Sequence, residues 1–317
     1  MEKPLIEVKH LKKFFDTPKG TLHAVDDVTF SIGKGKTMGV VGESGCGKST
    51  LGRTMIHLYE STDGQIIFDG EDVTHVNKKK LHELREKMQI IFQDPFASLN
   101  PRMTVEETIR EPLELSRKYN KNDLMDETER IMDMVGIDER LRHSYPHELD
   151  GGRRQRVGIG RALALNPAFV VCDEPVSALD VSIQAQVLNL LQDLQEKSGV
   201  TYMFVTHDLS VVKHISDNIC VMYLGQLVET TTSKELFARP LHPYTKALLS
   251  AIPSVDIHNR QKRIILQGEI VSPVEPKPGC RFAARCPYAT EKCHQPQELR
   301  EISKGHFVSC CRVEEIN

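Results

Sequence analysis

The chain has 317 residues, a formal net charge of -3 and eight cysteines. This length allows two domains, or one large domain with an appendage, and the charge balance gives no electrostatic footprint for nucleic acid. No run approaches the roughly 20 apolar residues needed to cross a bilayer, and the amino terminus opens into a strand pattern rather than a signal peptide. We therefore expect a soluble, cytoplasmic chain.

The first predicted elements are strands at residues 5–11 and 28–32, where apolar and polar residues alternate. Such alternation is typical of half-buried strands, so we expect an antiparallel β layer. Phe14 and Phe15 close the first of these strands. Position alone leaves open whether they pack in the core or face a ligand.

A phosphate-binding loop follows the apolar run at residues 38–41. It fits the pattern G-x-x-x-x-G-K-[ST] and reads Gly42-Glu43-Ser44-Gly45-Cys46-Gly47-Lys48-Ser49, with Thr50 continuing into a predicted helix. The glycines let successive N–H groups point at phosphates, and the start of the helix adds its positive end. Lys48 is expected to reach the β- and γ-phosphates, and the Ser49 hydroxyl to ligate Mg²⁺. The sequence therefore predicts binding of a nucleoside triphosphate.

A buried strand at residues 88–93 ends on Gln93. Ligands bind at the carboxyl ends of strands in open α/β sheets, so this amide is placed to reach a metal-bound nucleotide. The loop 94–101 carries Phe96 and Leu99, which we expect to be exposed as a partner contact, the alternative being a loop folded on the core. Residues 104–135 show helical periodicity that we expect to break at Pro112.

Two further segments carry candidate chemistry. Asp150, Gly151 and Gly152 open a helix whose start is a second anion-binding surface. An apolar strand at 168–172 runs into Asp173 and Glu174, one acid for Mg²⁺ and one to polarise the attacking water. His207 follows the strand at 201–206. We expect Gln93, Glu174 and His207 to share one sheet edge.

In this order and spacing, residues 5–237 resemble the ATP-binding subunits of ABC transporters. The resemblance implies an α/β fold of the P-loop NTPase type, with a RecA-like core, an antiparallel β layer and a helical subdomain at about 94–165. It also implies a head-to-tail dimer with two ATPs between a phosphate loop and the other subunit's signature. Phe15 matches the base-stacking ring, Gln93 the sensor that joins ATP to membrane subunits, and His207 the switch at the γ-phosphate.

Three stretches, 93–103, 173–182 and 239–245, resemble the oligopeptide/dipeptide importer branch, and nickel importers share much of them. Residues 211–225 are closest to the second of the two ATPases of such systems. The implied partners are a paralogous ATPase, two permease subunits and, indirectly, an extracytoplasmic binding protein. The implied location is the cytoplasmic face of the membrane. The signature departs from Leu-Ser-Gly-Gly-Gln, because Asp150 and Arg153 replace its Ser and Gln.

Five cysteines crowd into the last segment, with Cys280, Cys286, Cys293 and Cys310 at intervals C-x5-C-x6-C-x16-C and Cys311 in addition. The short hooks of tetrahedral zinc modules are absent, and four thiolates at longer intervals suit a 4Fe-4S cluster. This tail also resembles the carboxyl-terminal domain of peptide-importer ATPases, some of which carry a 4Fe-4S cluster. We rank a cluster above zinc, and zinc above free thiols or a disulfide. We expect an ATPase domain at 1–237 and a Cys-rich extension at 238–317 that needs its metal to stay folded.

Overall fold

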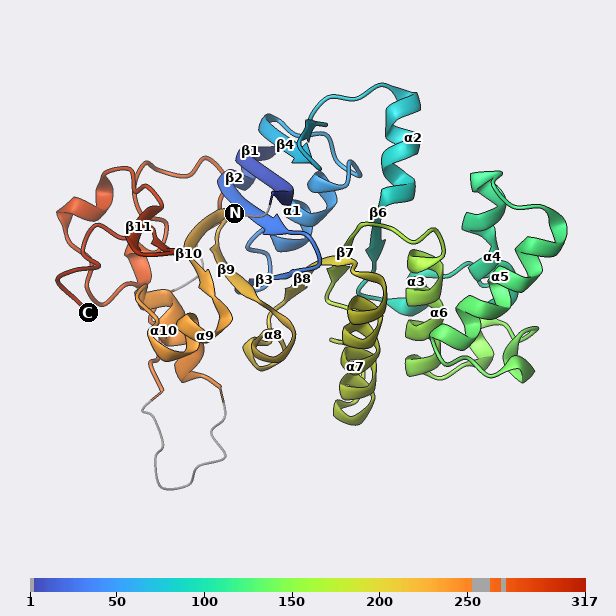
Figure 1. The fold of residues 1–317 in the computed structure, drawn as a ribbon. Helices are drawn as coiled ribbons and strands as arrows, with labels where there is room; N and C mark the ends of the chain where they lie inside the picture. The colour runs from blue at the N-terminus through green and yellow to red at the C-terminus, as the bar shows by residue number, and fades with distance from the viewer. Residues whose placement is uncertain (1–2, 253–262, 269–271) are drawn as a thin grey trace. The chain divides into compact units, whose positions relative to one another are not determined.

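The computed structural model describes residues 3–252, 263–268 and 272–317 (Figure 1). The chain divides into two compact units, Met1–His75 with Phe204–Asn317 (unit 1) and Val76–Met203 (unit 2). Unit 1 thus contains the amino-terminal strands, the phosphate loop and the carboxyl-terminal segment, and unit 2 contains the helical insert. The boundary expected at residue 237 stays a prediction.

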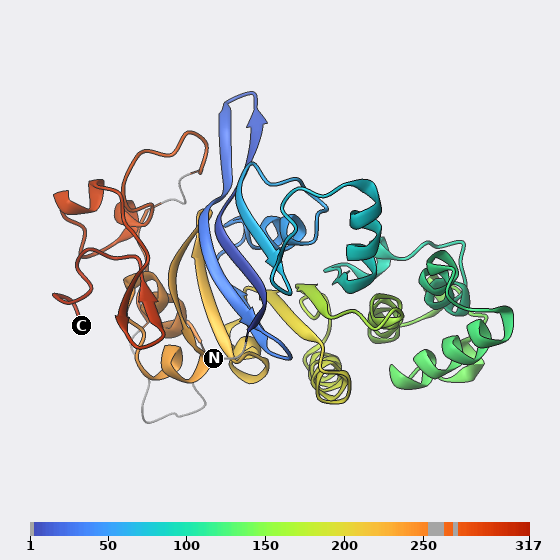
Figure 2. The same cartoon turned by 45° about the horizontal axis from the view of Figure 1, so that its top comes forward.

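Unit 1 begins with the predicted antiparallel layer. Strands β1 (Pro4–Thr17), β2 (Gly20–Gly33), β4 (Asp63–Phe68) and β5 (Glu71–Asp72) form one sheet in the order β2-β1-β4-β5. Both predicted strands are confirmed and are longer than expected, and they form the long blue hairpin in Figure 2. Val8, Val28 and Ile32 are buried on this layer, as the alternating pattern predicts.

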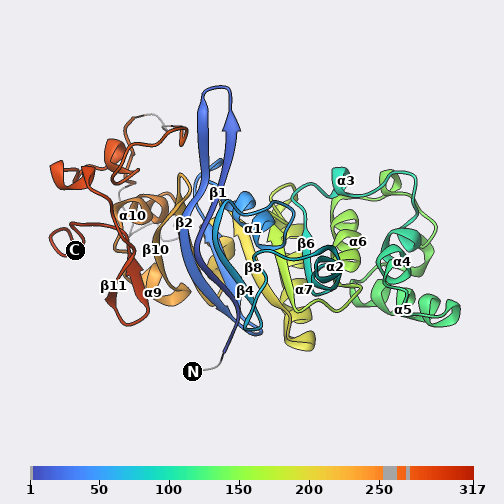
Figure 3. The same cartoon turned by 90° about the horizontal axis from the view of Figure 1, so that it is seen from above.

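A second set of strands in unit 1 follows the order β11-β12-β10-β9-β3. Their bounds are β3 (Thr37–Val41), β9 (Asn218–Tyr223), β10 (Gln226–Thr232), β11 (Arg300–Ser303) and β12 (His306–Val308). Strands β3 and β9 are parallel, with Met38 opposite Asn218, while β10 pairs antiparallel with β9 and with β12. The carboxyl-terminal segment therefore adds two strands to the sheet that carries the phosphate loop (Figure 3).

The helices of unit 1 are α1 (Lys48–Met55), α8 (Leu209–Ile215), α9 (Ser233–Ala238) and α10 (Pro243–Ser250), with short 3-10 turns η3 (Ala283–Arg285) and η4 (Glu291–His294). Strand β8 (Thr201–Thr206) starts in unit 2 and ends in unit 1. All six of its residues are buried.

The carboxyl-terminal segment has more apolar packing of its own than the sequence suggested. Leu241, Val308 and Val313 form a buried cluster, and Phe282 is 1% exposed. The segment is also joined to the sheet by backbone hydrogen bonds between β10 and β12. The segment therefore has packing and sheet contacts of its own, and the expectation that it needs a metal to stay folded stays a prediction.

A buried carboxylate also ties this segment to β10. Glu229, which is 0% exposed, accepts hydrogen bonds from the backbone N–H groups of Leu241 and His242, both at 2.8 Å. Its Oε1 lies 2.7 Å from Nε2 of His306. Burial lowers the pKa of His242 to about 4, so this imidazole is neutral at physiological pH.

Unit 2 contains a parallel pair of strands and the helical insert. Strands β6 (Met88–Ile91) and β7 (Phe169–Asp173) pair with Met88 opposite Phe169. The helices are α2 (Lys78–Lys87), α3 (Pro95–Ser98), α4 (Val105–Ser116), α5 (Lys121–Met134), α6 (Gly151–Leu163) and α7 (Val181–Ser198), with 3-10 turns η1 (Glu139–Leu141) and η2 (Pro146–Glu148).

Helix α4 corrects one expectation, because it continues through Pro112. Proline removes one backbone hydrogen bond from a helix interior. Ile109 and Leu113, on either side of it, are both fully buried. Packing on both sides of Pro112 thus outweighs the local penalty.

Candidate active site

The predicted site residues are divided between the two units. In unit 1 the phosphate loop connects β3 to α1. Gly47 has φ 104° and is the residue that precedes the helix, a conformation that favours glycine. A Cβ at Gly47 would lie 2.0 Å from the carbonyl oxygen of Ala24, and one at Gly42 would lie 2.1 Å from that of Met222. The loop therefore requires glycine at both positions.

The side chain of Lys48 donates hydrogen bonds to the backbone of the phosphate loop. It is 4% exposed, and its Nζ donates to the carbonyl oxygens of Gly42 at 2.8 Å and Glu43 at 3.0 Å. No side chain caps the start of α1. Ser49 and Thr50 lie in the first turn of this helix, and the start of a helix favours an anion through its dipole.

Glu43 has two partners outside the phosphate loop, Tyr244 and Arg285. Its backbone N–H donates to the Tyr244 hydroxyl at 2.8 Å, and its carboxylate accepts two hydrogen bonds from Arg285, at 2.7 and 3.1 Å. Sequence reasoning missed Tyr244 and Arg285 as partners of this loop. Glu43 and Arg285 are 242 positions apart, and a contact over that separation leaves no periodic pattern in the sequence. Arg285 also stands next to Cys286, whose thiol was the more evident candidate for function.

The other two predicted residues of unit 1 lie at its surface. Phe15 is half-buried in β1, with the ring of Tyr59 edge-on at 5.6 Å and Nζ of Lys13 4.8 Å from its centroid. His207 is exposed directly after β8. Their roles at the base and the γ-phosphate stay predictions.

In unit 2 the structure brings Gln93 and Glu174 together. Nε2 of Gln93 donates to Oε2 of Glu174 at 2.8 Å. Glu174 follows β7 with φ 49°, and Asp173, the last residue of that strand, is completely buried. Left-handed backbone at a non-glycine residue is a strained geometry that clusters at functional sites. Two residues predicted separately therefore meet at the carboxyl ends of β6 and β7.

Asp150 is the N-cap of α6. Its carboxylate accepts from the backbone N–H of Arg153 at 2.8 Å and lies 3.4 Å from that residue's Nε. Behind it the helix start is closely packed, because a Cβ on Gly152 would lie 2.7 Å from Cγ2 of Ile183. Gly151 and Gly152 thus give α6 a bare first turn, while Asp150 occupies one of its N–H donors.

The loop after Gln93 only partly matches expectation. Phe96 is 55% exposed, and the Arg154 guanidinium lies 4.9 Å from its ring centroid. Leu99 is 4% exposed, so the expectation of two exposed apolar residues is wrong. Arg161 donates to the carbonyl oxygen of Ser98 at 2.6 Å and holds this turn against α6.

The carboxyl-terminal cysteines converge. Cys280, Cys286, Cys293, Cys310 and Cys311 line one small cavity of about 10 Å³. Sγ of Cys293 and Sγ of Cys311 are 3.9 Å apart. Burial raises the pKa of Cys280 to about 12, and it also raises the pKa values of Cys286, Cys310 and Cys311. These four groups are therefore neutral thiols at physiological pH.

Thiols are suitable donors for an iron-sulfur cluster or for zinc, but these five side chains are not positioned to hold either. Throughout residues 3–252, 263–268 and 272–317, no three His, Cys, Asp or Glu side chains are placed to hold a metal ion. A volume of about 10 Å³ is near the minimum for one water molecule, which is too small for a cubane cluster. The predicted 4Fe-4S cluster and its zinc alternative are not supported by the cavity as it stands.

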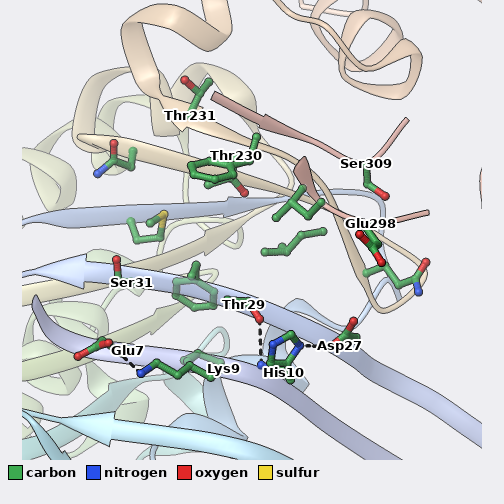
Figure 4. Close-up of a pocket in the computed structure, with 18 of the residues that line it drawn as sticks. Glu7, Lys9, His10, Asp27, Thr29, Ser31, Thr230, Thr231, Glu298 and Ser309 are labelled. Carbon is green, nitrogen blue, oxygen red and sulfur yellow. Dashed lines mark hydrogen bonds and ion pairs between the residues drawn. The ribbon is translucent and has the colours of Figure 1, made fainter. Parts of the chain in front are cut away.

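A larger groove of about 790 Å³ lies elsewhere in unit 1, between β1 and β2 on one side and β10 and β12 on the other (Figure 4). Two side-chain contacts border it, the ion pair of Glu7 with Lys9 at 3.4 Å and the hydrogen bond between Nδ1 of His10 and Asp27 at 2.7 Å. None of the predicted site residues is among those that line it.

Comparison with known proteins decides the family. The ABC transporter model matches residues 25–177, and the model of the oligopeptide/dipeptide transporter C-terminal region matches residues 228–293. The oligopeptide transport ATP-binding protein AppF of Bacillus subtilis is 48% identical, over 98% of this chain and 97% of its own. The chain belongs to the ATP-binding proteins of ABC peptide transporters. OppF of the same organism is 50% identical, over 99% of this chain and 98% of its own.

Solved structures agree on the ABC ATPase fold. CbiO1 of Clostridium perfringens, part of an ABC transporter complex, has a TM-score of 0.68 at 28% identity and covers 75% of this chain and 92% of its own. The ATP-binding cassette MJ0796, solved as a dimer bound to ADP and Pi, has a TM-score of 0.66 at 27% identity, with 72% and 98% covered.

ATP-binding proteins of this family hydrolyse ATP, dimerise and work with membrane permease subunits. Across the described parts of this ABC ATPase, no helix is long and apolar enough to cross a membrane.

Proposed function

We propose that this chain lies at the cytoplasmic face of the membrane and hydrolyses ATP there to energise the import of dipeptides and oligopeptides. The peptide class is supported by the match of residues 228–293 to the oligopeptide/dipeptide C-terminal region and by the two peptide-transport relatives. The hydrolytic role is supported by one contact above all, the 2.8 Å hydrogen bond that orients the Glu174 carboxylate toward Gln93.

We assign one task to each site residue. Lys48 and the first turn of α1 bind the phosphates, and Phe15 stacks on the base. Ser49, Asp173 and Gln93 are the residues that would hold Mg²⁺, because hydroxyl, carboxylate and amide oxygens suit that ion. Glu174 accepts the proton of the attacking water, and His207 contacts the γ-phosphate.

Replacing Glu174 by Gln separates binding from turnover. The amide keeps the shape but cannot accept a proton, so we expect ATP hydrolysis by the assembled transporter to fall by about a hundredfold or more, while the isolated chain still binds ATP. Lys48→Ala is the matched contrast, because it removes the phosphate contact and should weaken binding itself. Normal hydrolysis at the Glu174→Gln site would reject the catalytic assignment.

We also propose that the working dimer pairs this chain with a paralogous ATPase, and that the pair docks on two permeases fed by a peptide-binding protein. The support is Asp150, which replaces the signature serine, because its carboxylate would face the γ-phosphate of the partner's site. Two such sites in a homodimer would both be impaired, whereas a partner with an intact signature leaves one site fully competent.

Finally, we propose the thiol cavity as the site of a 4Fe-4S cluster, with zinc as the alternative. Its support is the convergence of Cys280, Cys286, Cys293 and Cys310 on one point of the extension. Because most of these thiols are neutral, binding must displace protons. Because the cavity is small, binding must also spread the segments that carry the thiols.

A further inference from the structure

Three groups of Glu43, in the phosphate loop, make hydrogen bonds: its backbone N–H, its carboxylate and its carbonyl oxygen. Its N–H donates to Tyr244, its carboxylate accepts both terminal nitrogens of Arg285, and its carbonyl oxygen accepts from Nζ of Lys48. One loop residue thus connects the lysine that contacts phosphate to two side chains from the part of the chain after residue 238.

The two partners are themselves rigidly packed. Tyr244 is 0% exposed, and the side chain of Arg285 is only 9% exposed. The guanidinium of Arg285 lies 6.0 Å from the ring centroid of Tyr223, and that ring meets Tyr244 at 4.7 Å and Phe282 at 5.3 Å. A planar guanidinium bonded to both carboxylate oxygens leaves Glu43 little freedom of position.

A second arginine of the same short segment supports the loop at another point. Arg281 donates to the carbonyl oxygen of Leu224 and to the carboxylate of Asp26. Gly225, the residue after Leu224, donates its N–H to the carbonyl oxygen of Cys46 at 2.8 Å. Residues 281–285 therefore brace the phosphate loop at Glu43 directly and at Cys46 through the turn after β9.

We propose that Arg285, with Tyr244, positions the phosphate loop, so that the carboxyl-terminal extension sets the affinity of this ATPase for nucleotide. Backbone N–H groups bind phosphate well only if they are already in place, because ordering a loop during binding opposes affinity. Arg285 also neutralises the Glu43 carboxylate, which would otherwise place a negative charge in a loop that binds phosphates. The inference rests on ATP binding at this loop.

The test is the affinity of the full chain for MgADP, measured by calorimetry well below the melting temperature of each variant. We expect Arg285→Gln to weaken binding by about tenfold, a size typical of one buried coupling. Arg285→Lys keeps the charge but loses the two-point contact, so it should fall in between. Tyr244→Phe should weaken binding a few-fold. Arg140→Gln, which breaks a similar two-point pair with exposed Asp138, should change nothing.

A double-mutant cycle separates positioning from a general loss of stability. If Arg285 acts through Glu43, adding Glu43→Gln to Arg285→Gln should lower the affinity no further, because it removes the carboxylate that Arg285 no longer neutralises. Unchanged affinity in Arg285→Gln and Tyr244→Phe, or fully additive losses with Glu43→Gln, would overturn the proposal, as would a lower melting temperature with no change in affinity. Failure of the unaltered chain to bind MgADP would overturn the nucleotide site, and this inference with it.

Discussion

At the scale of single residues, Asp150 has two opposing effects. As the N-cap of α6 it satisfies the N–H of Arg153, and aspartate and serine are both good residues for that position. As a signature residue it adds a negative charge where a γ-phosphate is expected. At ~4 Å and an effective dielectric of ~20, such a repulsion is about 4 kcal/mol before the helix start and Arg153 offset it.

Asp150→Ser should therefore speed hydrolysis at the partner-side site without loosening the helix. The site built on this chain's own Lys48 and Glu174 should keep its rate. Single-site turnover in the assembled heterodimer, with the other site disabled, measures each rate. Asp138→Ser, another exposed aspartate cap that accepts an arginine N–H, is the control and should alter neither site. Equal, full activity at both sites of a homodimer of the unaltered chain would disprove the asymmetry.

Among single residues, the sequence predicted best those whose role depends on local chain geometry. Asp173 and Glu174 lie at the end of the short apolar strand β7, and Lys48 begins the helix that follows the glycine-rich loop after β3, so their placement follows from the pattern of neighbouring residues. The partners of Glu43 could not be found this way. Tyr244 and Arg285 reach it across about two hundred residues or more, and no periodicity connects such positions.

At the scale of secondary-structure elements, the residue pattern predicted where the helices lie. It did not predict the positions at which tertiary packing outweighs a local preference. The alternation at 5–11 and 28–32 predicted β1 and β2 because one face of each is buried. Pro112 was expected to end a helix, and Leu99 was expected to be exposed. The fold buries Ile109, Leu113 and Leu99 against other helices of the insert, and such tertiary contacts are invisible in a local window.

The thiol cavity belongs to this scale as well, since segments that are separated along the chain contribute to it. Protein purified without oxygen should contain roughly four iron and four sulfide per chain, as cubane ligation by four cysteines requires. Cys286→Ser should lose the iron and the brown colour while the phosphate loop still binds ATP. Cys220→Ala removes a buried thiol outside the cavity and should keep the iron. Stoichiometric zinc without iron would favour the alternative, and a metal-free protein would contradict both.

At the scale of the whole molecule, the extension is part of unit 1 rather than a loosely attached tail. It adds β11 and β12 to the sheet, buries Glu229 and His306, and contacts the phosphate loop through Arg285. The sequence suggested a separate metal-dependent appendage because its cysteines and prolines dominate the composition. Its two short strands and its buried histidines gave no comparable signal.

The account's central claim is that ATP hydrolysis by this chain drives peptide import. The most direct measurement is ATP-dependent movement of a labelled oligopeptide out of the lumen of proteoliposomes that contain this chain, its partner ATPase and both permeases. The binding protein is supplied inside the vesicles and ATP outside, on the side of the ATPases, so transport is followed as loss of peptide from the lumen. We predict ATP-dependent peptide transport that Glu174→Gln abolishes and Arg140→Gln leaves intact. Transport of nickel but no peptide, or peptide transport that persists in Glu174→Gln, would contradict it.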